Sequence, residues 1–113
     1  MKYRSDIERK IHQGKLKNWS YESVKIEWED AKDKKHKYTA DFIHLNGKKM
    51  IEVKGYFRRG ERTKYKAIKK QNENVELIFA FQDPDRLIRR EKITYRYWCD
   101  KNGFTCFSWK QLL

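Results

Sequence analysis

The chain has 113 residues, the size of one ordinary domain, and a formal net charge of +12 from 28 lysines and arginines against 16 aspartates and glutamates. Charged residues make up 39% of it, but aromatic residues make up 15%, which is enough to build a core and excludes an intrinsically disordered chain. So large a positive charge predicts a polyanionic partner, either nucleic acid or an anionic membrane surface. We interpret residues 1–113 as a single basic domain.

Two further observations disfavour a membrane partner. No stretch of the sequence approaches the length of a transmembrane span, and the first ten residues, MKYRSDIERK, lack the apolar run of a signal peptide. Cys99 and Cys106 share no ligand spacing with a histidine, so we interpret them as partly buried thiols in a reducing compartment. We expect a cytoplasmic protein that binds no membrane.

The first predicted element is a helix over residues 5 to about 17. Ser5 is a favourable N-cap, and Glu8 three residues later completes a capping box. Ile7 and Ile11 lie one helical turn apart, so they share one face of this helix.

Three strands are predicted next. Apolar and polar residues alternate over 21–29, and a highly charged loop over 30–37 leads to a second strand over 38–45. Asn46-Gly47 is a strong hairpin signal, so the third strand, over 49–54, pairs with the second.

The remaining elements alternate between helix and strand. We expect a basic helix over 59–71, a buried central strand over 75–81, a helix over 93–101, a short strand over 104–107 and a final turn over 109–113. The predicted order, α-β-β-β-α-β-α-β-α, indicates an α/β fold with a mixed sheet flanked by helices.

The candidate chemistry lies on the hairpin. Strand side chains alternate in direction, so Glu52 and Lys54 point the same way, and Asp41 lies on the partner strand across the turn. Two carboxylates and the backbone carbonyl of Val53 suit a hard cation such as Mg²⁺, for which we expect Mn²⁺ to substitute. The Lys54 ammonium can orient a water molecule or offset negative charge that develops on a phosphate.

A simpler interpretation of these charges stays open. A hairpin face is often merely solvated, and Glu52 with Lys54 could form an exposed ion pair worth below ~1 kcal/mol. The strand context, the tight turn and the basic charge of the chain together favour a functional site.

The chain also resembles a known family. The segments YTADF (38–42), NG (46–47) and IEVKG (51–55) resemble the PD-(D/E)xK nuclease motif. More closely, the chain resembles the phage endonuclease I family of Holliday-junction resolvases, because RSDIE (4–8), RTKYK (62–66), VELIF (75–79) and YWCDKNG (97–103) agree in order and spacing. It departs from the pattern at Ala40, which replaces the proline that usually precedes the aspartate.

The resemblance implies a restriction-endonuclease-like sheet and an active site of Glu8, Asp41, Glu52 and Lys54. It also implies an intertwined homodimer of phage origin, in which Glu8 of one chain faces Asp41 of the other. The capping box is a competing explanation for Glu8, and the two roles are not exclusive.

Basic residues suggest where DNA binds. Residues 58–70 hold seven basic residues and one acid directly after the candidate catalytic strand, and a second basic cluster precedes Asp41. For individual lysines a solvated helix face is the alternative. The candidate DNA-binding residues are Arg4, Lys35, Lys37, Arg58, Arg59, Arg62, Lys64, Lys66 and Lys69.

The favoured interpretation is a Mg²⁺-dependent, structure-selective endodeoxyribonuclease that hydrolyses phosphodiester bonds and resolves four-way junctions and branched DNA. One alternative is a related nuclease for mismatched, transposon-end or plain duplex DNA. Another is a non-catalytic basic DNA-binding protein, against which the intact set of two carboxylates and a lysine argues.

Overall fold

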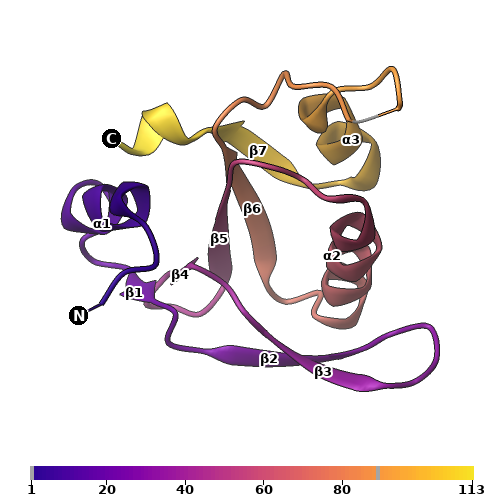
Figure 1. Cartoon of the computed structure of the whole chain (residues 1–113). Helices are drawn as coiled ribbons and strands as arrows, with labels where there is room; N and C mark the ends of the chain where they lie inside the picture. The colour runs from indigo at the N-terminus through magenta and orange to yellow at the C-terminus, as the bar shows by residue number, and fades with distance from the viewer. Residues whose placement is uncertain (1, 89) are drawn as a thin grey trace.

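The computed structural model describes residues 2–88 and 90–113 and folds around a five-stranded sheet (Figure 1). A separate two-stranded hairpin runs along one side of the molecule. The elements, in chain order, are α1 (Asp6–Gln13), β1 (Ser20–Tyr21), β2 (Lys25–Glu29), β3 (Lys35–Thr39), β4 (Phe42–Ile43), β5 (Lys49–Lys54), α2 (Arg59–Gln71), β6 (Glu76–Phe81), α3 (Tyr95–Asn102), β7 (Thr105–Ser108) and a short 3-10 helix, η1 (Trp109–Leu112).

The main sheet is mixed, in the order β1-β4-β5-β6-β7. β1, β4 and β5 are antiparallel neighbours, whereas β5, β6 and β7 are parallel. α2 carries the chain from β5 to β6 and α3 from β6 to β7, as parallel strands require a crossover. The predicted α/β class with a mixed sheet flanked by helices is confirmed.

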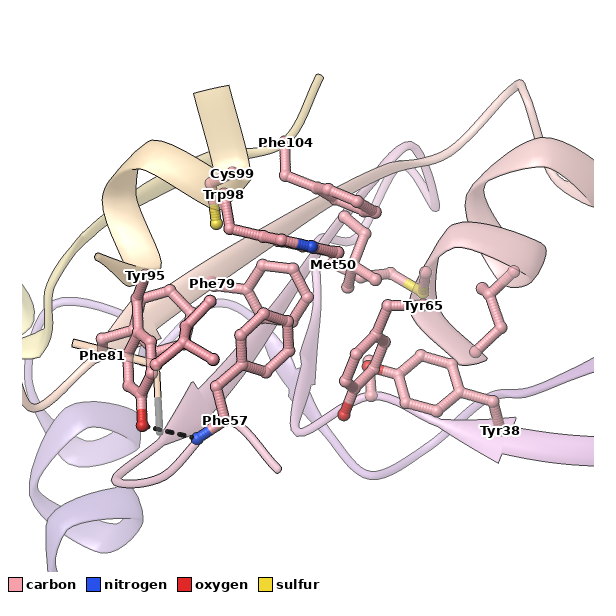
Figure 2. Packing of buried hydrophobic residues seen from close by; sticks show 14 of the residues in the cluster. Tyr38, Met50, Phe57, Tyr65, Phe79, Phe81, Tyr95, Trp98, Cys99 and Phe104 are labelled. Atoms are coloured by element: carbon pink, nitrogen blue, oxygen red, sulfur yellow. Dashed lines mark hydrogen bonds between the residues drawn. The ribbon is translucent and has the colours of Figure 1, made fainter. Parts of the chain in front are cut away.

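Two apolar clusters cover the two faces of the sheet. α1 and η1 close one face, where Ile11 and Leu112 pack with Phe42 and Ile51. α2 and α3 close the other, around a group of packed aromatic rings that includes Phe57 (Figure 2). β5 lies between both clusters, so its alternate side chains are held from two sides.

Phe57 is the centre of the larger cluster. Its ring packs within 6.0 Å of five other aromatic rings, and its backbone N–H donates a buried 3.0 Å hydrogen bond to the Tyr95 hydroxyl (Figure 2). This bond links the segment after β5 to α3 and therefore restrains the backbone just beyond Lys54.

Two predicted strands are each divided in the structure. The strand predicted over 21–29 breaks at Glu22, whose positive φ of 46° interrupts an extended chain. The strand predicted over 38–45 breaks between Thr39 and Phe42. The pieces β1 and β4 join the main sheet, while β2 and β3 pair with each other in a separate hairpin. The described residues therefore form two more strands than the sequence predicted.

The predicted loop over 30–37 is also shorter, because β3 begins at Lys35. The Asp30 carboxylate closes this turn by accepting the N–H groups of Lys32 and Lys34 at 2.9 and 3.0 Å. A side chain that replaces backbone acceptors in this way makes a tight turn.

Two predicted helices have different ends in the structure. α1 ends at Gln13, before Gly14, about four residues short of the predicted end, and α3 begins at Tyr95, two residues later than predicted, because the Thr94 side chain caps it. The second hairpin agrees with the sequence more closely. Gly47 has the positive φ of 73° that its turn requires. No helix in the described part of the chain is long and apolar enough to span a bilayer.

Candidate active site

Asp41 lies in the bend between β3 and β4, not inside a strand as we predicted. The Asp41 backbone carbonyl accepts the N–H of Glu22 at 2.9 Å. This hydrogen bond links the break between β3 and β4 to the break between β1 and β2. The carboxylate Oδ2 of Asp41 accepts the N–H of Val53 on β5 at 2.7 Å. The Asp41 carboxylate therefore replaces a backbone carbonyl as the acceptor for the Val53 N–H, at the point where β4 stops pairing with β5.

Glu52 and Lys54 lie on one face of β5, the face covered by α2, as the alternation of strand side chains predicts. Glu52 Oε1 accepts the Tyr38 hydroxyl at 2.7 Å and the backbone N–H of Asp41 at 3.3 Å. The Tyr65 hydroxyl lies 3.4 Å from Glu52 Oε2. Two tyrosines and one backbone group thus fix the orientation of a carboxylate that is only 13% exposed.

Glu8 is buried, although it lies in the first turn of α1. Its backbone N–H donates to Ser5 Oγ at 3.2 Å, which confirms the predicted N-cap. Its carboxylate accepts the Ser5 hydroxyl at 2.5 Å and the Tyr21 hydroxyl at 3.0 Å. The side chain therefore does not close a capping box on the Ser5 backbone but takes part in a buried polar cluster.

Glu8 also acts on Asp41 within this single chain. Burial, together with the charges of Glu52 and Glu8, raises the pKa of Asp41 to about 8, although the hydrogen bond from the Val53 N–H acts in the opposite direction. Burial likewise raises the pKa of Glu52, while the Tyr38 hydroxyl and the Lys54 ammonium lower it. The three carboxylates form a desolvated acidic cluster that a proton or a cation would stabilise.

Lys54 has an ionic partner that the sequence did not indicate. Its Nζ forms an ion pair with Glu61 in the first turn of α2, and it lies 4.0 Å from Glu52 Oε2. The same ammonium lies 5.3 Å from the centroid of the Tyr65 ring. No sequence pattern relates Glu61 to Lys54, because their contact depends on how α2 packs after the Gly55 bend.

The donor atoms fit a cation that needs few protein ligands. Within residues 2–88 and 90–113, no group of three or more His, Cys, Asp or Glu side chains forms a ready metal cage. Mg²⁺ uses one or two carboxylates and keeps several waters, so Asp41 and Glu52 suffice for it. The Val53 carbonyl faces the same open edge as its N–H, because both groups of a strand residue point to one side.

The predicted DNA-binding residues fall into separate groups. Lys35 and Lys37 are exposed on β3, and Arg4 pairs with Glu22 near the N-terminus. The others lie on or just before α2, beside the acidic cluster. These are Arg58, Arg59, Arg62, Lys64, Lys66 and Lys69.

Within this second group, Lys64 lies deepest in the site. Its Nζ lies 5.2 Å from the Tyr38 ring centroid and 5.4 Å from that of Tyr65, the two rings whose hydroxyls contact Glu52. Its charge also lowers the pKa of Glu52. Lys64 is therefore a second ammonium beside the carboxylates, after Lys54.

Comparison with known proteins gives the whole chain a family context. A family model described as phage endonuclease I matches residues 1–111, a range that includes Glu8, Asp41, Glu52 and Lys54. The chain is 29% identical to endodeoxyribonuclease 1 of Enterobacteria phage T3 over 105 residues, which span 89% of this chain and 68% of that protein. It is 27% identical to endonuclease I of Escherichia phage T7 over 108 residues, which span 89% of this chain and 69% of that protein.

The acidic cluster predicts a pH-dependent stability. The folded state holds the Asp41 proton up to about pH 8, whereas an unfolded aspartate releases it near its ordinary value of 3.8. The free energy of unfolding should therefore fall as the pH rises between these two values. In EDTA at pH 8, Asp41→Asn should be more stable than the wild type, by roughly 1–3 kcal/mol after allowance for partial exposure.

Urea denaturation from pH 5 to 8.5 measures this difference, and Asp100→Asn, which changes an exposed aspartate of α3, is the matched control. Mg²⁺ should raise the stability of the wild type at pH 8 but not that of Asp41→Asn. Equal stability of Asp41→Asn and wild type across this range would contradict the buried acidic cluster.

Proposed function

The chain belongs to the phage endonuclease I family, and we propose that it is a Mg²⁺-dependent endodeoxyribonuclease selective for branched DNA, including four-way junctions. One observation carries the proposal. The Asp41 carboxylate accepts the Val53 N–H at the open edge of β5, and the Glu52 carboxylate accepts the Asp41 N–H. Lys54 lies on the same strand face as Glu52. Solvated hairpin charges would not be buried and held by tyrosine hydroxyls in this way. We also assign the chain to the PD-(D/E)xK nucleases on these three residues.

Each residue of the site has a role that its contacts support. Asp41, Glu52 and the Val53 carbonyl would hold Mg²⁺, which when bound polarises a phosphoryl oxygen and acidifies a coordinated water. Lys54, with its partner Glu61, keeps an ammonium beside Glu52 and offsets the negative charge that develops on the phosphate. Glu8 adds a third carboxylate next to Asp41.

The neighbouring residues keep this arrangement rigid. Tyr38 and Tyr65 donate their hydroxyls toward Glu52, so its carboxylate cannot rotate freely. Glu61 holds the Lys54 ammonium at the start of α2. The basic residues of α2 then place phosphate-binding charges next to the carboxylates, so binding should weaken as salt concentration rises.

We further propose an intertwined homodimer. Glu8 precedes the β2–β3 hairpin and Asp41 follows it, so the hairpin turn is the natural point at which two chains could exchange segments. Opening this turn would let the segment up to β2 of one chain pack on its partner and would preserve the contact between Glu8 and Asp41. The dimer then carries two sites for paired cuts across a junction.

Because the relatives named above are phage proteins, we propose that this one is also phage-encoded and acts in the cytoplasm of a bacterial host.

Solution mass tests the dimer. Light scattering with size-exclusion chromatography should give about 28 kDa, twice the 14.0 kDa of one chain. A mass of one chain at micromolar concentration would rule out the exchange and leave a site completed within each protein.

Cleavage tests the enzyme. With Mg²⁺ the wild type should cut a synthetic four-way junction faster than a mismatched or a plain duplex, and EDTA should stop it. Glu52→Gln and Lys54→Met should each lower the rate by at least about 100-fold, the loss typical of removing one charge-stabilising group.

Gel analysis of end-labelled DNA gives the rates, and gel shifts in EDTA show whether the variants still bind. Equal cutting of all three DNAs would indicate a nuclease of another specificity. Binding without cutting under any divalent ion would leave only a DNA-binding protein.

The Lys54–Glu61 pair predicts a further effect on rate. Glu61→Gln keeps the shape of the side chain but removes the charge that holds the ammonium, so cleavage should slow by about 10-fold or more, as is typical for supporting partners. Glu76→Gln, at an exposed glutamate at the start of β6, is the matched control. The pH–rate profile should also shift for Glu61→Gln, and an unchanged profile and rate would show that Glu61 does not position Lys54.

A further inference from the structure

A large pocket opens next to the acidic site and is separate from it. Its volume is about 1040 Å³, and it lies between the segment after β5, the start of α2 and the loop before α3. Tyr56 lines it only two residues after Lys54, and Arg62 lines it directly after Glu61. Residues of the acidic site and of the pocket are therefore close neighbours along the chain.

The pocket is lined by an unusual number of arginines. Arg58, Arg59, Arg62, Arg86 and Arg90 all face it, against one carboxylate, Glu91. That carboxylate is already paired with Arg62 at 2.7 Å. The remaining guanidinium groups leave a strong positive charge, which fits a phosphate group.

One buried donor in the lining has no partner. Arg62 Nε is inaccessible to solvent and makes no hydrogen bond to the described residues, although the other end of the same guanidinium bonds to Glu91. An unpaired N–H in a folded protein is costly, and a bound anion that draws the guanidinium outward would satisfy it.

The pocket also offers a flat aromatic surface. Tyr56 is 61% exposed, and the Arg86 guanidinium lies 4.3 Å from the centroid of its ring. Leu87 beside them is 60% exposed. Aromatic rings, including that of tyrosine, and arginine guanidinium planes are surfaces on which unpaired nucleobases stack.

We propose that this pocket binds one unpaired nucleotide of the DNA substrate, with its base stacked at Tyr56 and Arg86 and its phosphate held by the arginines at the start of α2. The pocket is too small for a duplex but ample for a single nucleotide. The inference rests on the proposed function only in taking DNA as the ligand. It adds that the protein recognises an unstacked strand next to the cleaved bond.

Binding to two matched DNAs tests the inference without cleavage. One is a blunt 20-base-pair duplex, and the other is the same duplex with a three-nucleotide single-stranded extension that contains 2-aminopurine. Fluorescence anisotropy in EDTA at fixed salt should show about 10-fold tighter binding of the extended DNA by the wild type. The 2-aminopurine emission should be quenched as the base stacks.

Variants identify the pocket as the source of this gain. Tyr56→Ala should lose about 10-fold in affinity for the extended DNA and none for the blunt duplex, while Tyr56→Phe keeps the ring and should bind as the wild type does. Tyr97→Ala is the matched control, because Tyr97 is also exposed, at 48%, and lies under a cation, Lys101, but does not line the pocket. Circular dichroism confirms that each variant is folded.

The outcomes separate the two proposals. Equal affinity of the wild type for both DNAs, or an equal loss on both DNAs in Tyr56→Ala, would overturn the nucleotide pocket. Wild-type protein that prefers the extended DNA but never cuts DNA with Mg²⁺ would overturn the nuclease and leave the pocket standing.

Discussion

The burial of like charges beside one another is the constraint around which this protein is built. Glu8, Asp41 and Glu52 come from three separate segments, and burial, together with their mutual repulsion, raises the pKa of Asp41 far above its ordinary value. Such a cluster persists only if the rest of the fold holds it, since the free energy lost by burying each charge must be offset elsewhere. The apolar clusters on both faces of β5 supply that free energy. The acidic cluster is therefore locally destabilising and is held in place by a stable sheet, as is common at functional sites.

α2 connects the two functional surfaces described above. Tyr65 on its inner face contacts Glu52, and Glu61 in its first turn holds Lys54. Arg62, the next residue, turns toward the pocket. One helix thus positions groups of the acidic site and of the arginine pocket, so a shift of α2 on the sheet would alter both. The aromatic packing of Phe57 and Tyr65 makes such a shift costly (Figure 2).

The hairpin with Glu52 and Lys54 could be predicted from the sequence, because strand alternation and an Asn-Gly turn are local signals. The break at Glu22 could not, since a positive φ at a glutamate has no local signature and arises from the bond to the Asp41 carbonyl. The ion pair of Glu61 with Lys54 could not be predicted either, because the packing of α2 on the sheet decides which residues meet there. Glu8 shows the limit of a correct local rule. The predicted N-cap is present, but the Glu8 carboxylate accepts the Ser5 and Tyr21 hydroxyls and not the Ser5 backbone N–H.

The length of β4 has a consequence that reaches beyond the strand itself. β4 consists of Phe42 and Ile43, which pair with Ile51 and Met50 of β5, and the Asp41 side chain then accepts the Val53 N–H. Adding one residue to the turn around Gly47 would slide this pairing by one step and exchange the two faces of the strand. The turn at Gly47 therefore decides where the Asp41 carboxylate lies. A change in its length would displace the acidic cluster while leaving most of the hydrophobic core intact.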